Sequence, residues 1–415
     1  DAMGVTGFEF QRLHGMGEAL YDQIVGRQGF NIPCRIYAPI GNHEDLLAYL
    51  VRRLLENGSN TSFVNRIVDR DAPIEEIVAD PILKVSKLTH IPHPRIPAPR
   101  DLYGTGRLNS RGIDVSDLDC LRELANGIND ASHQYWRAGP IISGTLRSGE
   151  GRAILSPADK RRQVGAGVDA TEEEVDTALT LASCAYPAWA DTPAETRAAC
   201  LERTADLLEA ETPALLALCT LEAGKTLNDG IAEVREAVDF CRYYAARARA
   251  DFGEPQILPG PTGERDQLRW HGRGVFACIS PWNFPLAIFM GQVTAALVAG
   301  NSVLAKPAEQ TPLIAAYAVQ LLHRAGVPGN VLHLLPGDGA VGARLVDDER
   351  IGGVAFTGST ETARSINRTL AARQGSIVPL IAETGGQNVM LVDSSALPEQ
   401  VVVDVLASGF QSAGQ

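Results

Sequence analysis

The sequence lacks a long apolar run. No stretch approaches the roughly 18 apolar residues of a membrane span, and Asp1-Ala2-Met3-Gly4 lacks the basic-then-apolar order of a signal peptide. Positive charge is not in excess either, because 37 basic and 50 acidic residues give a net charge of −13. This balance argues against general binding to nucleic acid or anionic lipid. We therefore expect a cytoplasmic protein without a nucleic-acid partner in this segment, and membrane docking stays undecided.

Cysteine is scarce and scattered. The seven cysteines include no Cys-x-x-Cys pair, so neither a disulfide framework nor a zinc site is indicated. We expect reduced thiols that mostly fill the core. His90 and His93 lie among four prolines, in an extended segment that points the two rings apart. Solvated loop histidines are therefore favoured over metal ligands, and no metal site is predicted.

The 415 residues suffice for two or three domains. Residues 1–85 alternate short apolar runs with helix signals, which predicts a strand, helix, strand, helix series. This segment is too short to close a barrel, which takes roughly 250 residues. Residues 86–150 lose this regularity, and their prolines indicate a linker or extended arm.

Helix signals dominate residues 171–250. Thr171 and Thr192 each precede a glutamate by three positions, which predicts two helices that start with capping boxes. Gly224-Lys225-Thr226 is similar to the end of a phosphate-binding loop, but Cys219 replaces the required earlier glycine. A helix turn is therefore favoured there.

Five apolar runs follow, separated by helical stretches of about a dozen residues. They occupy 275–280, 302–305, 331–335, 351–356 and 377–381. Strands buried on both faces have this composition, and helices that cross between them give an open parallel, doubly wound α/β sheet. The residues after each strand should therefore meet at one edge, where ligands bind such sheets.

Two glycine-containing loops compete as the phosphate site at this edge. Gly337, Gly339 and Gly342 form a Gly-x-Gly-x-x-Gly pattern without the acidic residue expected about 20 positions later. Thr357-Gly358-Ser359 opens a helix, and a helix N-terminus suits an anion without any fingerprint. Tight-turn glycines and a serine cap explain either loop equally well, so both interpretations stay open.

Four motifs in the second half together resemble the NAD-dependent aldehyde dehydrogenase superfamily. They are Pro281-Trp282-Asn283-Phe284-Pro285, Lys306-Pro307-Ala308-Glu309, Phe356-Thr357-Gly358-Ser359 and Glu383-Thr384-Gly385-Gly386-Gln387-Asn388. Residues 8–18 and 49–58 resemble the end of the (β/α)₈ proline dehydrogenase barrel. Together they are similar to the bifunctional proline utilization A enzymes along essentially the whole chain. The resemblance implies a barrel remnant at 1–85, a linker at 86–150 and a Rossmann-like NAD-binding part at 151–415.

The resemblance also implies roles for single residues. Lys306 and Glu309 would hold the adenosine ribose and favour NAD over NADP, while Gly358 and Ser359 would meet the pyrophosphate. Trp282 joins these cofactor-binding residues. Asn283 would donate to the oxyanion, and Glu383 would be the base that prepares water. From the residues alone, Asn283 closing its loop and Glu383 capping a turn are equally good interpretations.

In the barrel remnant, the resemblance implies a proline site and a flavin site. Arg52 and Arg53 would pair with the carboxylate of proline, and Tyr49 would pack against its ring. Glu56 and Phe63 would lie near FAD. Adjacent helical residues point about 100° apart, however, so spacing alone favours a solvated or ion-paired role for at least one of the two arginines.

The implied function is proline catabolism. FAD-dependent oxidation of proline gives pyrroline-5-carboxylate, which hydrolyses to glutamate semialdehyde, and NAD-dependent oxidation then gives glutamate. The last residues, 408–415, resemble the lead-in to the family's Gly-Gln-Arg-Cys, so we expect the chain to stop before the catalytic cysteine. It would be an internal, inactive fragment of a homo-oligomeric parent and would retain at most weak NAD binding. Two alternatives stay open: a non-catalytic nucleotide-binding or assembly module, and a stand-alone aldehyde dehydrogenase with an N-terminal extension.

Overall fold

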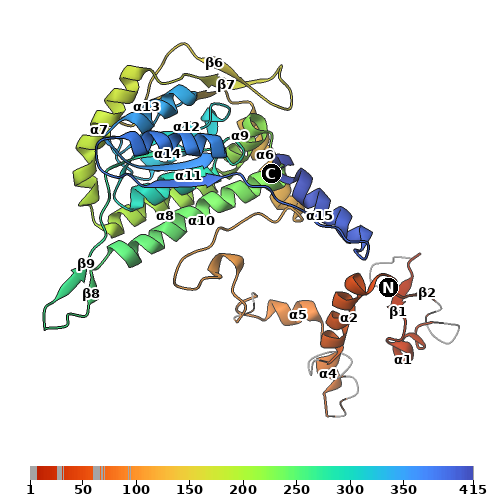
Figure 1. Ribbon diagram of the computed structural model, residues 1–415. Coiled ribbons are helices and arrows are strands. Elements are labelled where there is room, and N and C mark those ends of the chain that lie inside the picture. Colours follow the sequence, from red (N-terminus) through yellow and green to blue (C-terminus); the bar gives the residue numbers. More distant parts are fainter. Residues whose placement is uncertain are drawn as a thin grey trace. The chain divides into compact units, whose positions relative to one another are not determined.

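The computed structural model describes residues 7–25, 30, 32–58, 66, 69, 71–91, 93 and 95–414. The chain divides into two compact units, Asp1–His93 and Pro94–Gln415. Each unit has its own helices and strands (Figure 1).

In the first unit, two short strands pair in parallel. β1 (Phe10–Leu13) pairs with β2 (Cys34–Tyr37), and α1 (Glu18–Tyr21) lies between them in the sequence. A parallel pair requires a crossover connection rather than a tight hairpin. The helices that follow are α2 (His43–Gly58), α4 (Ile74–Ile77) and α5 (Pro81–Ser86). The strand, helix, strand, helix order agrees with the sequence prediction.

In the second unit, the five predicted strands form one parallel sheet. They are β10 (Val275–Ile279), β11 (Ser302–Lys306), β12 (Leu332–Leu334), β13 (Ile351–Gly358) and β14 (Leu380–Thr384). Their order is β14-β13-β10-β11-β12, and each neighbouring pair is parallel. β4 (Ile141–Ile142) and β5 (Thr145–Leu146) extend the sheet in antiparallel pairing. The predicted open α/β sheet is therefore confirmed.

Helices cover both faces of this sheet (Figure 1). Alternate side chains of β10 enter two separate cores: Phe276 and Cys278 on one face, Ala277 and Ile279 on the other. The first face packs against α11 (Ala287–Val298) and α12 (Pro312–Arg324), and α8 (Ala194–Ala210), α9 (Thr212–Ala223) and α10 (Leu227–Phe252) extend the same core behind these two helices. The second face packs against α7 (Glu172–Ala190), α13 (Gly339–Asp347) and α14 (Thr360–Ala372). The strands are thus buried on both sides, as their continuous apolar runs require.

The remaining elements lie around this body. They are α6 (Leu118–Ser132), α15 (Pro398–Phe410), β3 (Trp136–Ala138), β6 (Arg152–Leu155), β7 (Gln163–Gly167), β8 (Gln256–Leu258), β9 (Asp266–Leu268), and the 3₁₀ turns η1 (Pro99–Asp101) and η2 (Gln411–Gly414). The stretch 86–150, for which the sequence predicts a linker or arm, contains α6 and three strands, two of which join the main sheet.

One of the two predicted capping boxes is present. At α7, the Thr171 hydroxyl accepts from the Glu174 N–H at 3.2 Å, and the Glu174 carboxylate accepts from the Thr171 N–H at 3.0 Å. At α8 the prediction is wrong. The Thr192 hydroxyl donates to the Ala188 carbonyl at 2.9 Å, and Pro193 occupies the cap position. Because α7 ends only two residues before Thr192, its unpaired carbonyls compete for that hydroxyl.

The cysteines are free thiols, and Cys200, Cys219, Cys241 and Cys278 are buried, as expected for core residues. Among the described residues, no helix combines the length and apolar character needed to cross a membrane. The same part of the chain brings together no group of three or more His, Cys, Asp or Glu side chains suited to a metal ion.

Candidate active site

A pocket of about 1140 Å³ opens where three strands of the main sheet end. Its lining includes Pro281-Trp282-Asn283 after β10, Thr357-Gly358-Ser359 at the end of β13 and Glu383-Thr384-Gly385 at the end of β14. The sequence runs from β10 outward through β11 and β12, then returns to β13 on the other side of β10. Ligands of open α/β sheets bind at such a reversal of strand order. The pocket therefore lies where the fold favours a ligand.

Trp282 and Asn283 lie in the turn between β10 and α11. Trp282 is 43% exposed, and both residues line the pocket. α11 begins at Ala287 without a side-chain cap from its own first residues. Its backbone N–H groups at Leu286 and Ala287 instead donate to Glu233 of α10, at 3.3 and 2.8 Å. The turn that carries Asn283 is thus held by a strand on one side and by a buried carboxylate on the other.

The N-terminus of α14 faces the same pocket. Ser359 caps this helix, because its hydroxyl accepts from the Thr362 N–H at 3.1 Å. A side chain at Gly358 would meet the Phe356 ring, since a Cβ there would lie 2.6 Å from Cζ. Gln292 of α11 donates to the Thr357 hydroxyl at 3.0 Å and fixes the end of β13. A serine cap uses one N–H, so the partial positive charge of the first turn still suits an anion.

Glu383 brings a carboxylate to this cavity. It lies opposite Thr357 in the β13–β14 pairing, one strand further from β10, and its side chain is exposed. Asn283 and Glu383 both line the pocket. An amide and a carboxylate therefore share one cavity with a helix N-terminus.

Lys306 and Glu309 lie beside this cavity but do not line it. Lys306 ends β11 opposite Ile279, and its stem lies against Gly342 of α13. Its ammonium donates to the Pro307 carbonyl at 3.2 Å, and burial lowers the pKa of Lys306, partly opposed by the nearby carboxylates. The Glu309 side chain is exposed, while its carbonyl accepts from Arg152. The predicted ribose site is therefore on the α13 face of the sheet.

The structure separates the two glycine loops that the sequence left open. Gly337, Gly339 and Gly342 are absent from the pocket lining, whereas Gly358 and Ser359 belong to it. Asp338 caps α13 by accepting from the Ala340 N–H at 2.8 Å. Gly337 precedes this cap, while Gly339 and Gly342 lie within α13.

Four of the five predicted proline and flavin residues of the first unit lie on α2: Tyr49, Arg52, Arg53 and Glu56. Arg53 forms an ion pair with Glu56 at 2.7 Å, and its guanidinium lies 5.2 Å from the ring centroid of Tyr49. Arg52 is exposed. Spacing favoured a solvated or ion-paired role for at least one of the two arginines; Arg52 is the exposed one and Arg53 the ion-paired one. Phe63 lies outside the described residues.

Sequence reasoning missed the groups that hold the pocket loops. Gln292 and Glu233 lie within helices, where the sequence does not distinguish a polar residue that holds a loop from one that is solvated. Lys225 was interpreted only as part of a turn. Lys225 and Glu233 form a buried ion pair at 2.9 Å. In the part of the chain that the structure describes, no cysteine lines the pocket, and Cys278 is enclosed in β10, where burial raises its pKa to about 12. A thiol that stays protonated in the core is unreactive.

Comparisons with known proteins assign both parts of the chain. The model of the aldehyde dehydrogenase family matches residues 146–415, and the proline dehydrogenase model matches residues 1–66. Over 98% of its length, the chain is 54% identical to the bifunctional protein PutA of Klebsiella aerogenes. It covers 31% of that protein, so it spans about a third of the length of the curated relatives it matches.

Solved structures show the same relationship. A crystal structure of bifunctional proline utilization A aligns with the whole chain, which covers 39% of it, at a TM-score of 0.76 and 50% identity. A 1-pyrroline-5-carboxylate dehydrogenase from Thermus with bound NAD aligns with 72% of the chain and 60% of its own length, at a TM-score of 0.67 and 31% identity. The chain therefore belongs to the aldehyde dehydrogenase family, joined to a proline dehydrogenase segment as in the bifunctional PutA proteins.

Proposed function

We propose that residues 151–415 carry the NAD-binding and aldehyde-binding surfaces of an L-glutamate γ-semialdehyde dehydrogenase. The observation that carries this proposal is the shared pocket, which joins Asn283, Glu383 and the N-terminus of α14 at the reversal of strand order. The full-length protein would oxidise proline to pyrroline-5-carboxylate with FAD and would then oxidise the derived semialdehyde to glutamate with NAD. Both steps act on small molecules.

The proposed NAD site uses groups on two sides of the carboxyl edge. Lys306 and Glu309 would hold the adenosine ribose, and the exposed Glu309 carboxylate would repel a 2′-phosphate, which favours NAD over NADP. Gly358 lets the chain approach the pyrophosphate closely, and Ser359 places it at the start of α14. Trp282 would pack along the cofactor. Bound NAD supplies the acceptor for the hydride.

The proposed chemistry at the pocket uses an amide and a carboxylate. The Asn283 amide donates to the oxygen that becomes negative when a nucleophile adds to the aldehyde. Glu383 takes the proton from the water that later attacks the acyl group. Because no cysteine among the described residues lines the pocket, we propose that these 415 residues bind NAD without oxidising an aldehyde by themselves. The same absence favours the second candidate, a nucleotide-binding module without catalysis, and an aldehyde assay on the full-length polypeptide separates the two.

For the first unit, we propose that α2 contributes to a proline site beside FAD. Arg52 and Arg53 would pair with the substrate carboxylate, and Tyr49 would pack against its ring. Glu56 fits less simply, because it already neutralises Arg53. Arg53 would therefore have to exchange partners when proline binds. Phe63 remains a proposed flavin contact.

Calorimetric titration of NAD into the 415-residue chain tests the NAD site. We expect the double variant Lys306→Ala/Glu309→Ala to lower affinity by about tenfold or more, because a charge-assisted contact and a carboxylate contact are both lost. The control is Arg247→Ala/Asp251→Ala, which removes an exposed ion pair of α10 that is not part of the pocket lining. Equal heats for the wild type and the Lys306/Glu309 variant would refute the assignment.

The wider organisation is also a proposal. We propose domain limits at 1–85, 86–150 and 151–415, and a cytoplasmic homo-oligomer for the full-length protein. Light scattering of the full-length polypeptide checks the oligomer, and limited proteolysis checks the limits. A monomer, or first cuts inside 171–250, would contradict these proposals.

A further inference from the structure

A buried lysine and a buried glutamate lie directly behind the Asn283 turn. Lys225 belongs to the turn between α9 and α10, and Glu233 lies two helical turns further along α10. Their side chains are 2% and 1% exposed, and the Lys225 Nζ lies 2.9 Å from Glu233 Oε1. Charged groups this deep are rare unless they are paired and satisfied. The proposed chemistry assigns neither residue a role.

Both side chains contact residues that follow Asn283. The Lys225 Nζ lies 3.9 Å from the ring centroid of Phe284, the residue that follows Asn283. Glu233 Oε2 accepts from the backbone N–H groups of Leu286 and Ala287, which start α11. The pair therefore fixes one ring and two backbone donors within four residues of the amide.

Lys225 makes a third contact, with η2. Its Nζ donates to the hydroxyl of Ser412 at 3.1 Å, and Ser412 has a φ of 48°. This residue lies in η2, within the segment that resembles the lead-in to the family's cysteine motif. One ammonium thus joins three parts of the second unit: α10, the Asn283 turn and η2.

The local sequence explains why Lys225 reaches this position. Gly224 ends α9 in the left-handed conformation, with φ 70°, and the Lys225 N–H donates to the Cys219 carbonyl at 3.1 Å. Thr226 then caps α10. A glycine turn between two capped helices fixes the lysine backbone, so the side chain has few alternatives.

We propose that Lys225 and Glu233 are positioning residues that hold the Asn283 amide at the place where the oxyanion forms. This inference rests on the proposed function of Asn283. The pair does not touch the substrate; it acts through Phe284 and the start of α11. An oxyanion donor is effective only within a few tenths of an ångström of its place, and a misplacement of about 1 Å costs about a hundredfold in rate.

The decisive experiment is a double-mutant cycle in the full-length polypeptide that contains these residues. The variants are Lys225→Met, Asn283→Ala and their combination, assayed for NAD-dependent oxidation of glutamate semialdehyde per folded molecule. We expect Asn283→Ala to lower kcat by about 100-fold, and Lys225→Met to lower it by about 10- to 100-fold with KM for NAD nearly unchanged. In the Asn283→Ala background, Lys225→Met should cost less than about threefold. Lys225→Arg should restore part of kcat.

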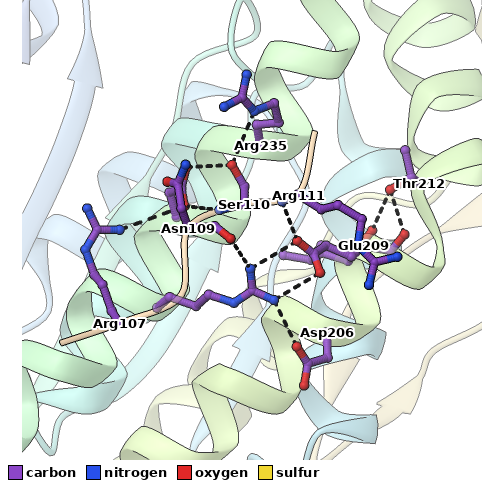
Figure 2. Close-up of polar contacts among 11 residues, drawn as sticks. Arg107, Asn109, Ser110, Arg111, Asp206, Glu209, Thr212 and Arg235 are labelled. Atoms are coloured by element: carbon purple, nitrogen blue, oxygen red, sulfur yellow. Dashed lines mark hydrogen bonds and ion pairs between the residues drawn. The ribbon is translucent and has the colours of Figure 1, made fainter. Parts of the chain in front are cut away.

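Arg242→Met is the matched control. Arg242 lies on the same helix, is 4% exposed, and donates to Asp206 and Glu209 and to the Asn109 carbonyl. Figure 2 shows Asp206 and Glu209 beside the Asn109–Arg111 segment. Among the contacts of the described residues, this ion-pair group holds the Asn109–Arg111 segment, and both of its acidic members belong to α8. Its loss should reduce stability and leave kcat per folded molecule within about twofold.

Each outcome is decisive. If Asn283→Ala lowers kcat but Lys225→Met does not, the positioning role is wrong and the proposed function stands. The same holds if the loss of kcat in the combined variant equals the product of the losses in the two single variants. If Asn283→Ala leaves kcat unchanged, the proposed oxyanion role fails first. Should Lys225→Met not fold, Glu233→Gln enters the same cycle, because it keeps the size and an acceptor oxygen while breaking the ion pair.

Discussion

Glu222 should make the stability of the second unit depend on pH. This glutamate of α9 is 4% exposed, and its carboxylate accepts from the N–H groups of Leu313 and Ile314, at 2.7 and 3.0 Å, at the start of α12. Burial raises the pKa of Glu222 from 4.5 to about 8, although the two backbone donors oppose the shift. The folded protein therefore binds this proton more tightly than the unfolded chain does.

The sign and size of the effect follow from linkage. A carboxyl group whose pKa is raised on folding contributes its full stability below the unfolded pKa and loses it as pH rises through the folded pKa. Between pH 5 and pH 8, a shift from 4.5 to about 8 removes about 3 to 4 kcal/mol from the free energy of unfolding. Glu222→Gln carries no titrating proton. The free energy of unfolding of Glu222→Gln relative to wild type should therefore rise by about 3 to 4 kcal/mol from pH 5 to pH 8. A pH-independent loss adds to this difference, because a glutamine caps the start of α12 less well than a carboxylate does.

Urea unfolding followed by tryptophan fluorescence measures this difference. All four tryptophans, Trp136, Trp189, Trp270 and Trp282, belong to the second unit, so the signal reports on the unit that contains Glu222. Glu150→Gln makes the same substitution at an exposed loop position and should show no such trend. A difference between wild type and Glu222→Gln that stays constant from pH 5 to pH 8 would show that the buried carboxyl does not titrate as described.

Three further outcomes are expected. Gly358→Ala should weaken NAD binding by about tenfold or more in calorimetry, because its Cβ would collide with Phe356, while Gly339→Ala, with open space around it, should not. Thr171→Ala should lower the free energy of unfolding in urea by about 1 kcal/mol because it removes a capping box, and Thr192→Ala should lower it by less than half of that. Equal losses for the two variants would show that the bond from Thr192 to the Ala188 carbonyl stabilises the protein as much as the capping box does. A thiol reagent should modify the two exposed cysteines in the native chain and reach the buried ones only after unfolding; rapid native reaction of all would contradict the burial of Cys200, Cys219, Cys241 and Cys278.

Much of the sheet could be predicted from the sequence because buried parallel strands leave a strong signal. The runs at 275–280 and 302–305 coincide with β10 and β11 almost residue for residue. The predicted run at 377–381 begins three residues before β14, which starts at Leu380. The antiparallel strands β4 and β5 were missed because they have two residues each, and β4 pairs with β12 while β5 pairs only with β4. Elements that short have no periodicity to detect.

The pocket was predictable only in part. Residues directly after strands, such as Asn283 and Glu383, could be named because the topology brings strand ends together. The face of the sheet on which Lys306 lies could not be predicted, because it depends on the register of β11 against β10. Glu222 and Glu233 could not be recognised either. Their burial and partners arise from helix packing, and a glutamate within a helical sequence is usually solvated.

The helices on one face of the sheet also organise the loops at its edge. α11 and α12 both begin without a cap from their own cap residues, Leu286 and Thr311. Because buried N–H groups at a helix start need an acceptor, another element must supply it. Glu233 and Glu222, on either side of the α9–α10 turn, do so. A change in this turn should therefore reach the loops after both β10 and β11, although none of its residues lines the pocket. The sequence of the Gly224-Lys225 turn is therefore constrained by the two helix starts that its neighbouring glutamates hold at the edge of the sheet.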